Sequence, residues 1–253
     1  MPNLKKITSA LLSATLVLAL FSSLSLAEGS KAHWGYTGHE GPASWGELSP
    51  KYKMCGMGKN QSPINVTTSL DADLDAISPE YKSASKEIVN NGHTIQVNVE
   101  AGDTLSVDGI TFELKQFHFH TPSENHIDGK SFPLEAHFVH LDKEGNIAVL
   151  ALMFEEGEEN KALSKIWEKM PKTANEKSIL VLSNISKALL PENKEYYRFN
   201  GSLTTPPCSE GVRWLVLKTP VSISKAQVET FLHTMQHPNN RPIQATNARM
   251  IVK

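Results

Sequence analysis

A two-residue alternation of apolar and polar side chains dominates the middle of the chain and predicts β-strands. The turn-forming pair Asp108-Gly109 separates two alternating runs, which is typical of a two-residue β-hairpin. The loop 142–146 separates two more and predicts a second hairpin with a longer connection. The alternating runs are residues 87–100, 104–107, 110–120, 134–141 and 147–154.

Two other segments have the 3.6-residue apolar spacing of an amphipathic helix. Residues 161–170 end before Pro171, and residues 224–235 begin with a capping box formed by Ser224 and Gln227. The pattern predicts no other helix. We therefore expect a mainly β, single-domain fold, built on a large twisted and mostly antiparallel sheet with a few peripheral helices.

The N-terminus has the order of a secretory signal peptide. A basic pair precedes an apolar run over residues 7–20, and small side chains precede a cleavage position after Ala27. A membrane anchor is the alternative, but the run is shorter than the ~18 apolar residues of a spanning helix. We expect residues 1–27 to be removed and residues 28–253 to form a periplasmic or secreted protein without a membrane span.

Composition narrows the functional classes. The 253 residues are 40% hydrophobic and 21% charged, which is typical of a globular protein. Lys and Arg number 25 against 27 Asp and Glu, so the net charge of −2 lacks the basic signature of a nucleic-acid-binding protein. Cys55 and Cys208 are the two cysteines, and in an oxidising compartment we expect them to form one disulfide.

Histidines carry the most specific chemical signal, and they are densest in residues 116–120. Alternate side chains of a strand share a face, so Gln116, His118 and His120 point one way. The phenylalanines between them point into the core. Two imidazoles therefore converge on one point.

The next predicted strand adds a third imidazole. Glu135 and His137 share one of its faces and His140 lies on the other, although strand parity alone does not exclude His140 as a ligand. Three histidines with an open fourth position are typical of a catalytic zinc site. Gln116 and Glu135 each lie two residues from a histidine on the same face, where they can hold the orientation of its ring.

Several segments together carry a family resemblance. They are residues 33–36, 60–65, 90–93, 116–125 (QFHFHTPSEN), 135–140, 201–208 (GSLTTPPC), 214–218 and 240–242. With them the sequence closely resembles the bacterial alpha-class carbonic anhydrases, over nearly the whole of residues 28–253. The resemblance implies a ten-stranded sheet and a zinc-dependent lyase. It selects His118, His120 and His137 as the zinc ligands and leaves His140 as a non-ligand.

The resemblance also implies a mechanism, the reversible hydration of carbon dioxide to bicarbonate and a proton by a zinc-bound hydroxide. In it Thr204 accepts the hydrogen bond of the hydroxide and Glu124 accepts the Thr204 hydroxyl proton. The Thr204 backbone N–H steadies an oxygen of the substrate. His93 is the implied proton shuttle.

The remaining roles also follow from the resemblance. The implied substrate-binding residues are Val139, Val149, Leu203, Thr204, Thr205, Val212 and Trp214. The implied proton path is lined by Tyr36, Asn91 and Gln96, and Gln96 departs from the Asn of the animal enzymes.

Other functions would use the same site differently. A zinc-dependent esterase would attack an ester carbonyl with the same nucleophile. A catalytically silent extracytoplasmic zinc-binding module or a metal carrier would use the histidines for binding alone. Because family members are often dimers, a homodimer is a further expectation, although no patch in the sequence identifies an interface.

Overall fold

The computed structural model describes residues 32–67 and 69–253. The predicted signal peptide lies outside the described residues. Residues 33–253 form one compact unit. Among the described residues, no helix is long and apolar enough to cross a membrane.

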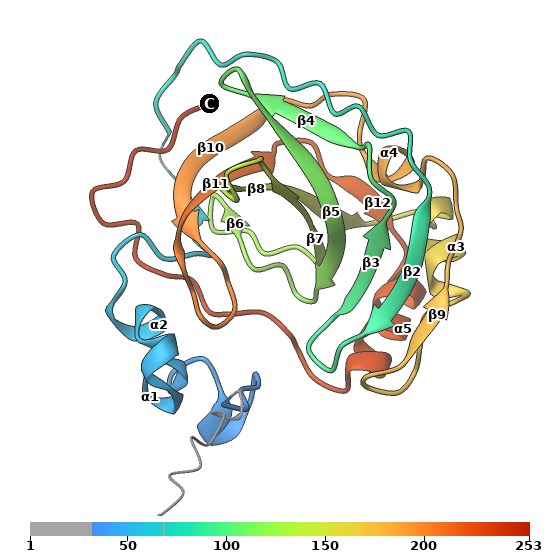
Figure 1. Ribbon diagram of the computed structural model, residues 1–253, viewed down its shortest axis with the longest axis horizontal. Helices are drawn as coiled ribbons and strands as arrows, with labels where there is room; N and C mark the ends of the chain where they lie inside the picture. Colours follow the sequence, from blue (N-terminus) through green and yellow to red (C-terminus); the bar gives the residue numbers. More distant parts are fainter. Residues whose placement is uncertain (1–31, 68) are drawn as a thin grey trace, which may run out of the picture. The chain divides into compact units, whose positions relative to one another are not determined.

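One large sheet of ten strands organises this unit (Figure 1). Its strand order is β10-β11-β8-β7-β5-β3-β2-β9, with β12 beside β8 and β4 beside β5. The strands of this sheet are β2 Ser85–Asn90, β3 Ile95–Val99, β4 Thr104–Val107, β5 Ile110–His120, β7 Leu134–Leu141, β8 Ile147–Glu156, β9 Lys177–Ile179, β10 Tyr196–Ser202, β11 Glu210–Leu217 and β12 Val221–Ile223. A small parallel pair is formed by β1 Asn65–Val66 and β6 His126–Ile127.

The expected fold class is confirmed, with one refinement in the strand pairing. Most neighbours are antiparallel, including the predicted hairpins β4–β5 and β7–β8. Strand β8, however, pairs in parallel with both β11 and β12, so the sheet is mixed. Strand direction is set by long-range pairing, which a local alternation pattern does not encode.

The alternating run 87–100 is two strands rather than one. It divides into β2 and β3 at residues 91–94, where Asn91 Oδ1 accepts hydrogen bonds from the backbone N–H groups of His93 and Thr94 at 2.9 Å each. Gly92 has φ +84° there, a conformation that favours glycine. The reversal therefore depends on local turn chemistry inside an otherwise continuous alternation.

Both predicted helices are present, but the prediction of only two was wrong. The α-helices are α1 Trp45–Leu48, α2 Met54–Met57, α3 Lys161–Trp167, α4 Ile185–Leu189 and α5 Lys225–Met235, and the 3-10 helices are η1 Gly38–Glu40 and η2 Pro50–Tyr52. The additional helices are too short to repeat an apolar period. The Ser224–Gln227 capping box begins α5 as predicted.

Helix α3 ends three residues before its predicted end. Lys169 and Met170 donate backbone hydrogen bonds to Ile166 and Trp167, so the last turn tightens to i→i+3 spacing.

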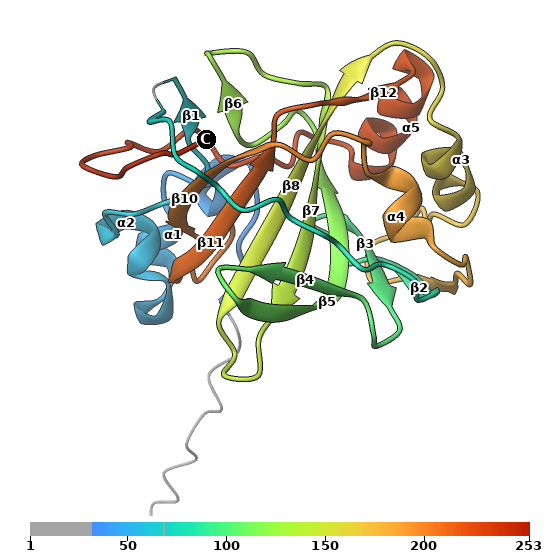
Figure 2. The same ribbon diagram turned by 90° about the horizontal axis from the view of Figure 1, so that it is seen from above.

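Two apolar clusters hold the sheet from its two faces. The larger includes Phe117, Phe119 and Phe138 and packs against α3, α4 and α5, which lie together in Figure 2. The smaller includes Val149 and Trp214 on the opposite face. The predicted division of strand β5 is confirmed, because its phenylalanines enter the larger cluster and its histidines face the other side of the sheet.

Candidate metal centre

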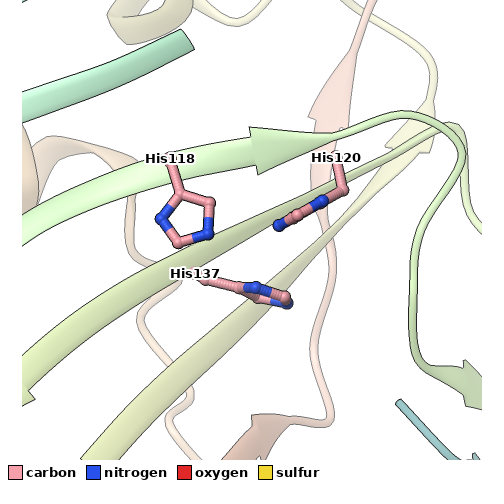
Figure 3. A group of neighbouring side chains, drawn as sticks. All are labelled: His118, His120 and His137. Carbon is pink, nitrogen blue, oxygen red and sulfur yellow. The ribbon is translucent and has the colours of Figure 1, made fainter. Parts of the chain in front are cut away.

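Strands β5 and β7 bring three histidines together on one face of the sheet. His118 and His137 are direct cross-strand partners, and His120 is two residues farther along β5. One ring nitrogen from each lies within 4.8 Å of the other two, and Figure 3 shows the three rings converging. Among the described residues, this is the one group of three or more potential metal ligands.

Each imidazole uses its other ring nitrogen to donate a hydrogen bond to a fixed oxygen. His118 Nδ1 donates to Gln116 Oε1, His120 Nδ1 to the Asn239 carbonyl and His137 Nε2 to Glu135 Oε1, each at 2.8 Å. These bonds set the tautomers, because an amide carbonyl oxygen and a carboxylate only accept. The lone pairs of His118 Nε2, His120 Nε2 and His137 Nδ1 are left for a metal.

Asn239 is a residue that the sequence analysis missed. It contributes a main-chain carbonyl, and its side chain also accepts a hydrogen bond from the Thr121 backbone at 2.8 Å. Its position directly before the motif at residues 240–242 was the available signal. A backbone acceptor otherwise has no signature in the side-chain pattern.

Burial keeps these imidazoles neutral. His120 and His137 are buried, and burial is the largest effect that lowers the pKa of His118, His120 and His137 from the usual value. His120 Nε2 is buried and has no hydrogen-bond partner among the described residues. A neutral, buried and unpartnered nitrogen beside a ring nitrogen from each of two further imidazoles fits Zn²⁺, which binds well to imidazole ligands and leaves a position open in catalytic sites.

His140 is buried on the opposite face of β7 and takes no part in this group. Its Nε2 accepts a hydrogen bond from the Tyr81 hydroxyl at 2.6 Å, and its Nδ1 donates to the Ala148 carbonyl at 3.2 Å. Burial lowers the pKa of His140 to about 4, so the ring is neutral at physiological pH. Both nitrogens are already used within the protein.

A buried carboxyl group lies against the histidines. Glu124 Oε2 is 3.5 Å from His120 Nε2 and 3.8 Å from His137 Nδ1. Glu124 Oε1 accepts the Arg241 backbone N–H at 2.8 Å. Burial raises the pKa of Glu124 well above the usual value, and hydrogen bonds from the Arg241 backbone and the Thr204 side chain oppose that rise. Glu124 and Thr204 are therefore brought together beside the histidines.

Arg241 is a second residue whose role the sequence analysis did not assign. Its guanidinium is buried and donates to Gln61 Oε1, the Ser62 carbonyl and the Cys55 carbonyl at 2.8–2.9 Å. The side chain anchors the segment whose backbone N–H binds Glu124. Its membership in the 240–242 motif was the signal.

Comparison with known proteins places the chain in a family. The profile described as eukaryotic-type carbonic anhydrase matches residues 40–253. A carbonic anhydrase from Neisseria gonorrhoeae is 51% identical over 243 residues, 96% of each chain. The chain belongs to the alpha-class carbonic anhydrase family. The solved alpha-carbonic anhydrase of Thermovibrio ammonificans, in complex with the inhibitor sulfanilamide, has 53% identity and a TM-score of 0.87, covering 88% of this chain and 100% of that one.

These relatives confirm the resemblance found in the sequence and identify the chain as a carbonic anhydrase. A second relative, from Pectobacterium carotovorum, is 50% identical over 241 residues, 95% of this chain and 98% of its own. The family match therefore extends over both hairpins and every segment of the metal centre described above.

An apolar wall adjoins the histidines in this carbonic anhydrase. Val149, Val212 and Trp214 are buried in the smaller cluster, with Val139 and Leu203 partly buried against it. The Trp214 ring lies edge-on to His137, with centroids 4.9 Å apart, and its Nε1 donates to the Ser202 carbonyl. Thr205 is half-buried. Five of the side chains expected to bind substrate, Val139, Val149, Leu203, Val212 and Trp214, thus belong to the apolar cluster on the metal-facing side of the sheet.

The residues of the expected proton path lie in the N-terminal segment, in the β2–β3 turn and in strand β3. His93 is half-buried and follows the Asn91 turn, and Gln96 is the direct cross-strand partner of His118. Burial raises the pKa of Tyr36 well above the usual value, and the Glu124 carboxylate raises it further. Tyr36 is therefore protonated at physiological pH, and it lies within electrostatic range of Glu124.

The predicted disulfide is confirmed. Cys55 and Cys208 are bonded across 153 residues of sequence, with Cα atoms 5.0 Å apart. The bridge joins helix α2 to the loop that follows Thr204 and Thr205. Gln61 Nε2 donates to the Cys208 carbonyl at 3.1 Å and ties the same loop a second time.

Proposed function

We propose that this chain catalyses the reversible hydration of carbon dioxide to bicarbonate and a proton, with zinc held by His118, His120 and His137. The observation that carries the proposal is the convergence of three neutral imidazoles, with His120 Nε2 buried and unpartnered among the described residues. When bound, zinc supplies Lewis-acid chemistry that lowers the pKa of a water toward neutrality, as is established for carbonic anhydrases.

The protein orients the zinc ligands through fixed acceptors. Gln116 Oε1, the Asn239 carbonyl and Glu135 Oε1 each hold one ring. Glu135 is itself held, because its Oε2 accepts the backbone N–H groups of Glu124 and Asn125 at 2.6 and 2.8 Å. This second layer raises the basicity of the ligands and prevents their rotation.

Glu124 and Thr204 orient the attacking oxygen. In this proposal the Thr204 hydroxyl donates to the Glu124 carboxylate, so the Thr204 oxygen can only accept a further hydrogen bond. An attacking oxygen beside it must donate a hydrogen bond to the Thr204 oxygen, and the lone pair of the attacking oxygen then points toward the substrate carbon. The Thr204 backbone N–H donates to a substrate oxygen as negative charge develops there.

Carbon dioxide suits the apolar wall because the molecule is uncharged and has no hydrogen-bond donor. Val149, Val212 and Trp214 provide a buried apolar surface, and Val139 and Leu203 extend it. Such a wall holds the substrate without competing for the polar groups that bind bicarbonate.

His93 carries the product proton away. Burial lowers its pKa from the usual value, and the nearby His33 and His237 lower it further. The neutral imidazole can accept a proton from the site and pass it to buffer. The proposed water path from the metal centre to His93 is lined by Tyr36, Asn91 and Gln96.

Stopped-flow measurement of carbon dioxide hydration tests the function. We expect the purified protein to carry about one zinc per chain, to lose its activity with a zinc chelator and to recover it with added zinc. Hydrolysis of an activated ester, measured in parallel, separates the esterase alternative. Stoichiometric zinc without hydration activity would instead favour a silent binding module.

We also propose that residues 1–27 direct the chain out of the cytoplasm and are removed, leaving residues 28–253 as the catalytic domain. The Cys55–Cys208 disulfide supports an oxidising compartment. Cell fractionation and the intact mass of the product test this. A product that begins at residue 28 outside the cytoplasm is expected, and an uncleaved cytoplasmic chain would contradict it. Sedimentation of the same product tests the homodimer.

A further inference from the structure

A line of hydrogen-bonded side chains runs from the edge of the sheet to Gln96, which lies on the strand beside the metal centre. It begins at Lys177 on the edge strand β9, whose Nζ is 3.1 Å from Glu87 Oε2 on β2. Glu87 Oε1 accepts from Asn98 Nδ2 at 2.9 Å, and Asn98 Oδ1 accepts from Gln96 Nε2 at 2.7 Å. Four side chains on three strands are thus joined in series.

The inner end of this line lies beside a metal ligand. In the β3–β5 pairing, Gln96 is directly opposite His118 and Asn98 is directly opposite Gln116. Side chains opposite one another on neighbouring strands have Cβ atoms about 5 Å apart on the same face. Gln116 is the residue that holds the His118 ring.

The charge at Glu87 decides which way both amides face. Its hydrogen bond to Asn98 and its ion pair with Lys177 lower the pKa of Glu87, so the group is a carboxylate, which only accepts. Asn98 must therefore present its NH₂ to Glu87 and its oxygen to Gln96. Gln96 must in turn present its NH₂ to Asn98.

We propose that Glu87 is a positioning residue that acts through Asn98 to turn the Gln96 carboxamide so that Oε1, an acceptor, faces the space beside His118. An acceptor there holds water that donates toward Gln96, which gives the proton path a fixed hydrogen-bond direction. The same oxygen repels anions near the metal. The inference rests on the proposed function, because the proton path and the bound zinc are those of the proposed enzyme.

Exchanging the charges of Glu87 and Lys177 should reverse the direction of the hydrogen bonds along the line. In the double variant Glu87→Lys/Lys177→Glu the ion pair is retained, but residue 87 can only donate. Asn98 then turns its oxygen toward residue 87, and Gln96 turns its NH₂ toward the space beside His118. We expect thiocyanate to bind the zinc-loaded variant roughly 3- to 10-fold more tightly, the effect of one gained hydrogen bond.

Calorimetric titration with thiocyanate is the primary readout, and hydration kinetics is the second. We expect kcat to fall severalfold while kcat/KM stays nearly unchanged, because only the proton path is altered. A general loosening of the sheet would weaken anion binding rather than strengthen it. Unchanged or weaker thiocyanate affinity in the zinc-loaded variant overturns the proposal.

Two controls complete the design. Lys177→Ala removes the ion pair but leaves the Glu87–Asn98 bond, so thiocyanate affinity should match that of the original protein. Glu113→Gln removes a carboxylate that is paired with Lys115, outside the line, and should also have no effect. If the double variant does not fold, Glu87→Lys alone reverses the hydrogen bonds in the same way, because Lys177 is exposed and can turn away. Tighter thiocyanate binding by this variant would again support the proposal, and unchanged or weaker binding would overturn it. An original protein without zinc or hydration activity would overturn the proposed function first, so the two failures are distinguishable.

Discussion

The indole ring of Trp34 lies flat against the imidazole ring of His93, with ring centroids 3.8 Å apart and 9° between the planes. Trp34 is itself held edge-on by Tyr36 and Trp45, at 5.6 and 5.3 Å. Trp45 is fully buried, and its Nε1 donates to the Gly35 and Glu40 carbonyls. The N-terminal segment therefore provides a rigid aromatic support for the histidine that we expect to carry protons.

Replacement of that histidine should separate proton transfer from the carbon dioxide step. In His93→Ala we expect kcat in weak buffer to fall roughly 100-fold, the lower end of the effect of a positioned acid–base group. The value of kcat/KM should stay nearly unchanged, because the carbon dioxide step precedes proton exit. Added imidazole should restore part of kcat. His39→Ala, at an exposed histidine, is the control, and an unchanged kcat in His93→Ala would show that protons leave by another route.

Metal analysis should divide the histidines of β5 and β7 into two groups. We expect His118→Ala, His120→Ala and His137→Ala each to lose most of the bound zinc and the activity. His140→Ala should retain nearly stoichiometric zinc, because both nitrogens of His140 are bonded to Tyr81 and Ala148 on the other face. Loss of zinc from His140→Ala with retention in His137→Ala would contradict the assignment.

The Glu135 carboxylate should be sensitive even to its amide analogue. Its oxygens accept hydrogen bonds from His137, the Asn125 side chain and two backbone N–H groups. Glu135→Gln puts an NH₂ group opposite a donor, so we expect zinc affinity to fall about 10- to 100-fold. Competition with a chelator measures the zinc affinity of each variant. Glu155→Gln on the surface is the control, and equal zinc affinity in both variants would argue against a role for Glu135.

Reduction of the disulfide should affect both stability and activity. The 153-residue separation corresponds to roughly 5 kcal/mol at most in the chain-entropy model. We expect the melting temperature to fall by up to roughly 10–20 °C. Activity should also fall, because Cys208 ends the loop that carries Thr204. The variant Cys55→Ser/Cys208→Ser should be insensitive to the reductant, and two free thiols in the untreated native protein would contradict the prediction.

His140 should make the fold sensitive to acid. An imidazole in the unfolded chain titrates near pH 6.5, whereas burial lowers the pKa of His140 to about 4. Between these values the unfolded chain binds a proton that the folded chain does not, so stability is lost as the pH falls from about 6.5 to about 4. The loss amounts to about 3 kcal/mol.

Urea unfolding of the original protein and His140→Gln over this range tests the prediction. At pH 7 the original protein should be the more stable, because Gln cannot reproduce both hydrogen bonds of the ring. The difference in free energy of unfolding between the original protein and His140→Gln should narrow by about 3 kcal/mol as the pH falls to 4. A constant difference between the two proteins would show that His140 does not titrate in this way.

Local patterns in the sequence were sufficient for the features that depend on neighbouring residues. A strand alternates its side chains with a period of two, so the order Gln116-Phe117-His118-Phe119-His120 by itself put the two histidines on one face and the rings between them in the core. The Asp108-Gly109 turn and the Ser224 capping box are equally local. The single disulfide followed from having two cysteines and a secretory leader.

Only the tertiary structure decided which distant groups complete the site. The Asn239 carbonyl reaches His120 across 119 residues, and Arg241 reaches Gln61 across 180. The line from Lys177 to Gln96 exists because β9, β2 and β3 are neighbours in the sheet. Alternation shows which face a side chain occupies, but it does not show which strand lies beside it. That choice is made by packing of the whole sheet, where long-range contacts repay the entropy of closing long loops.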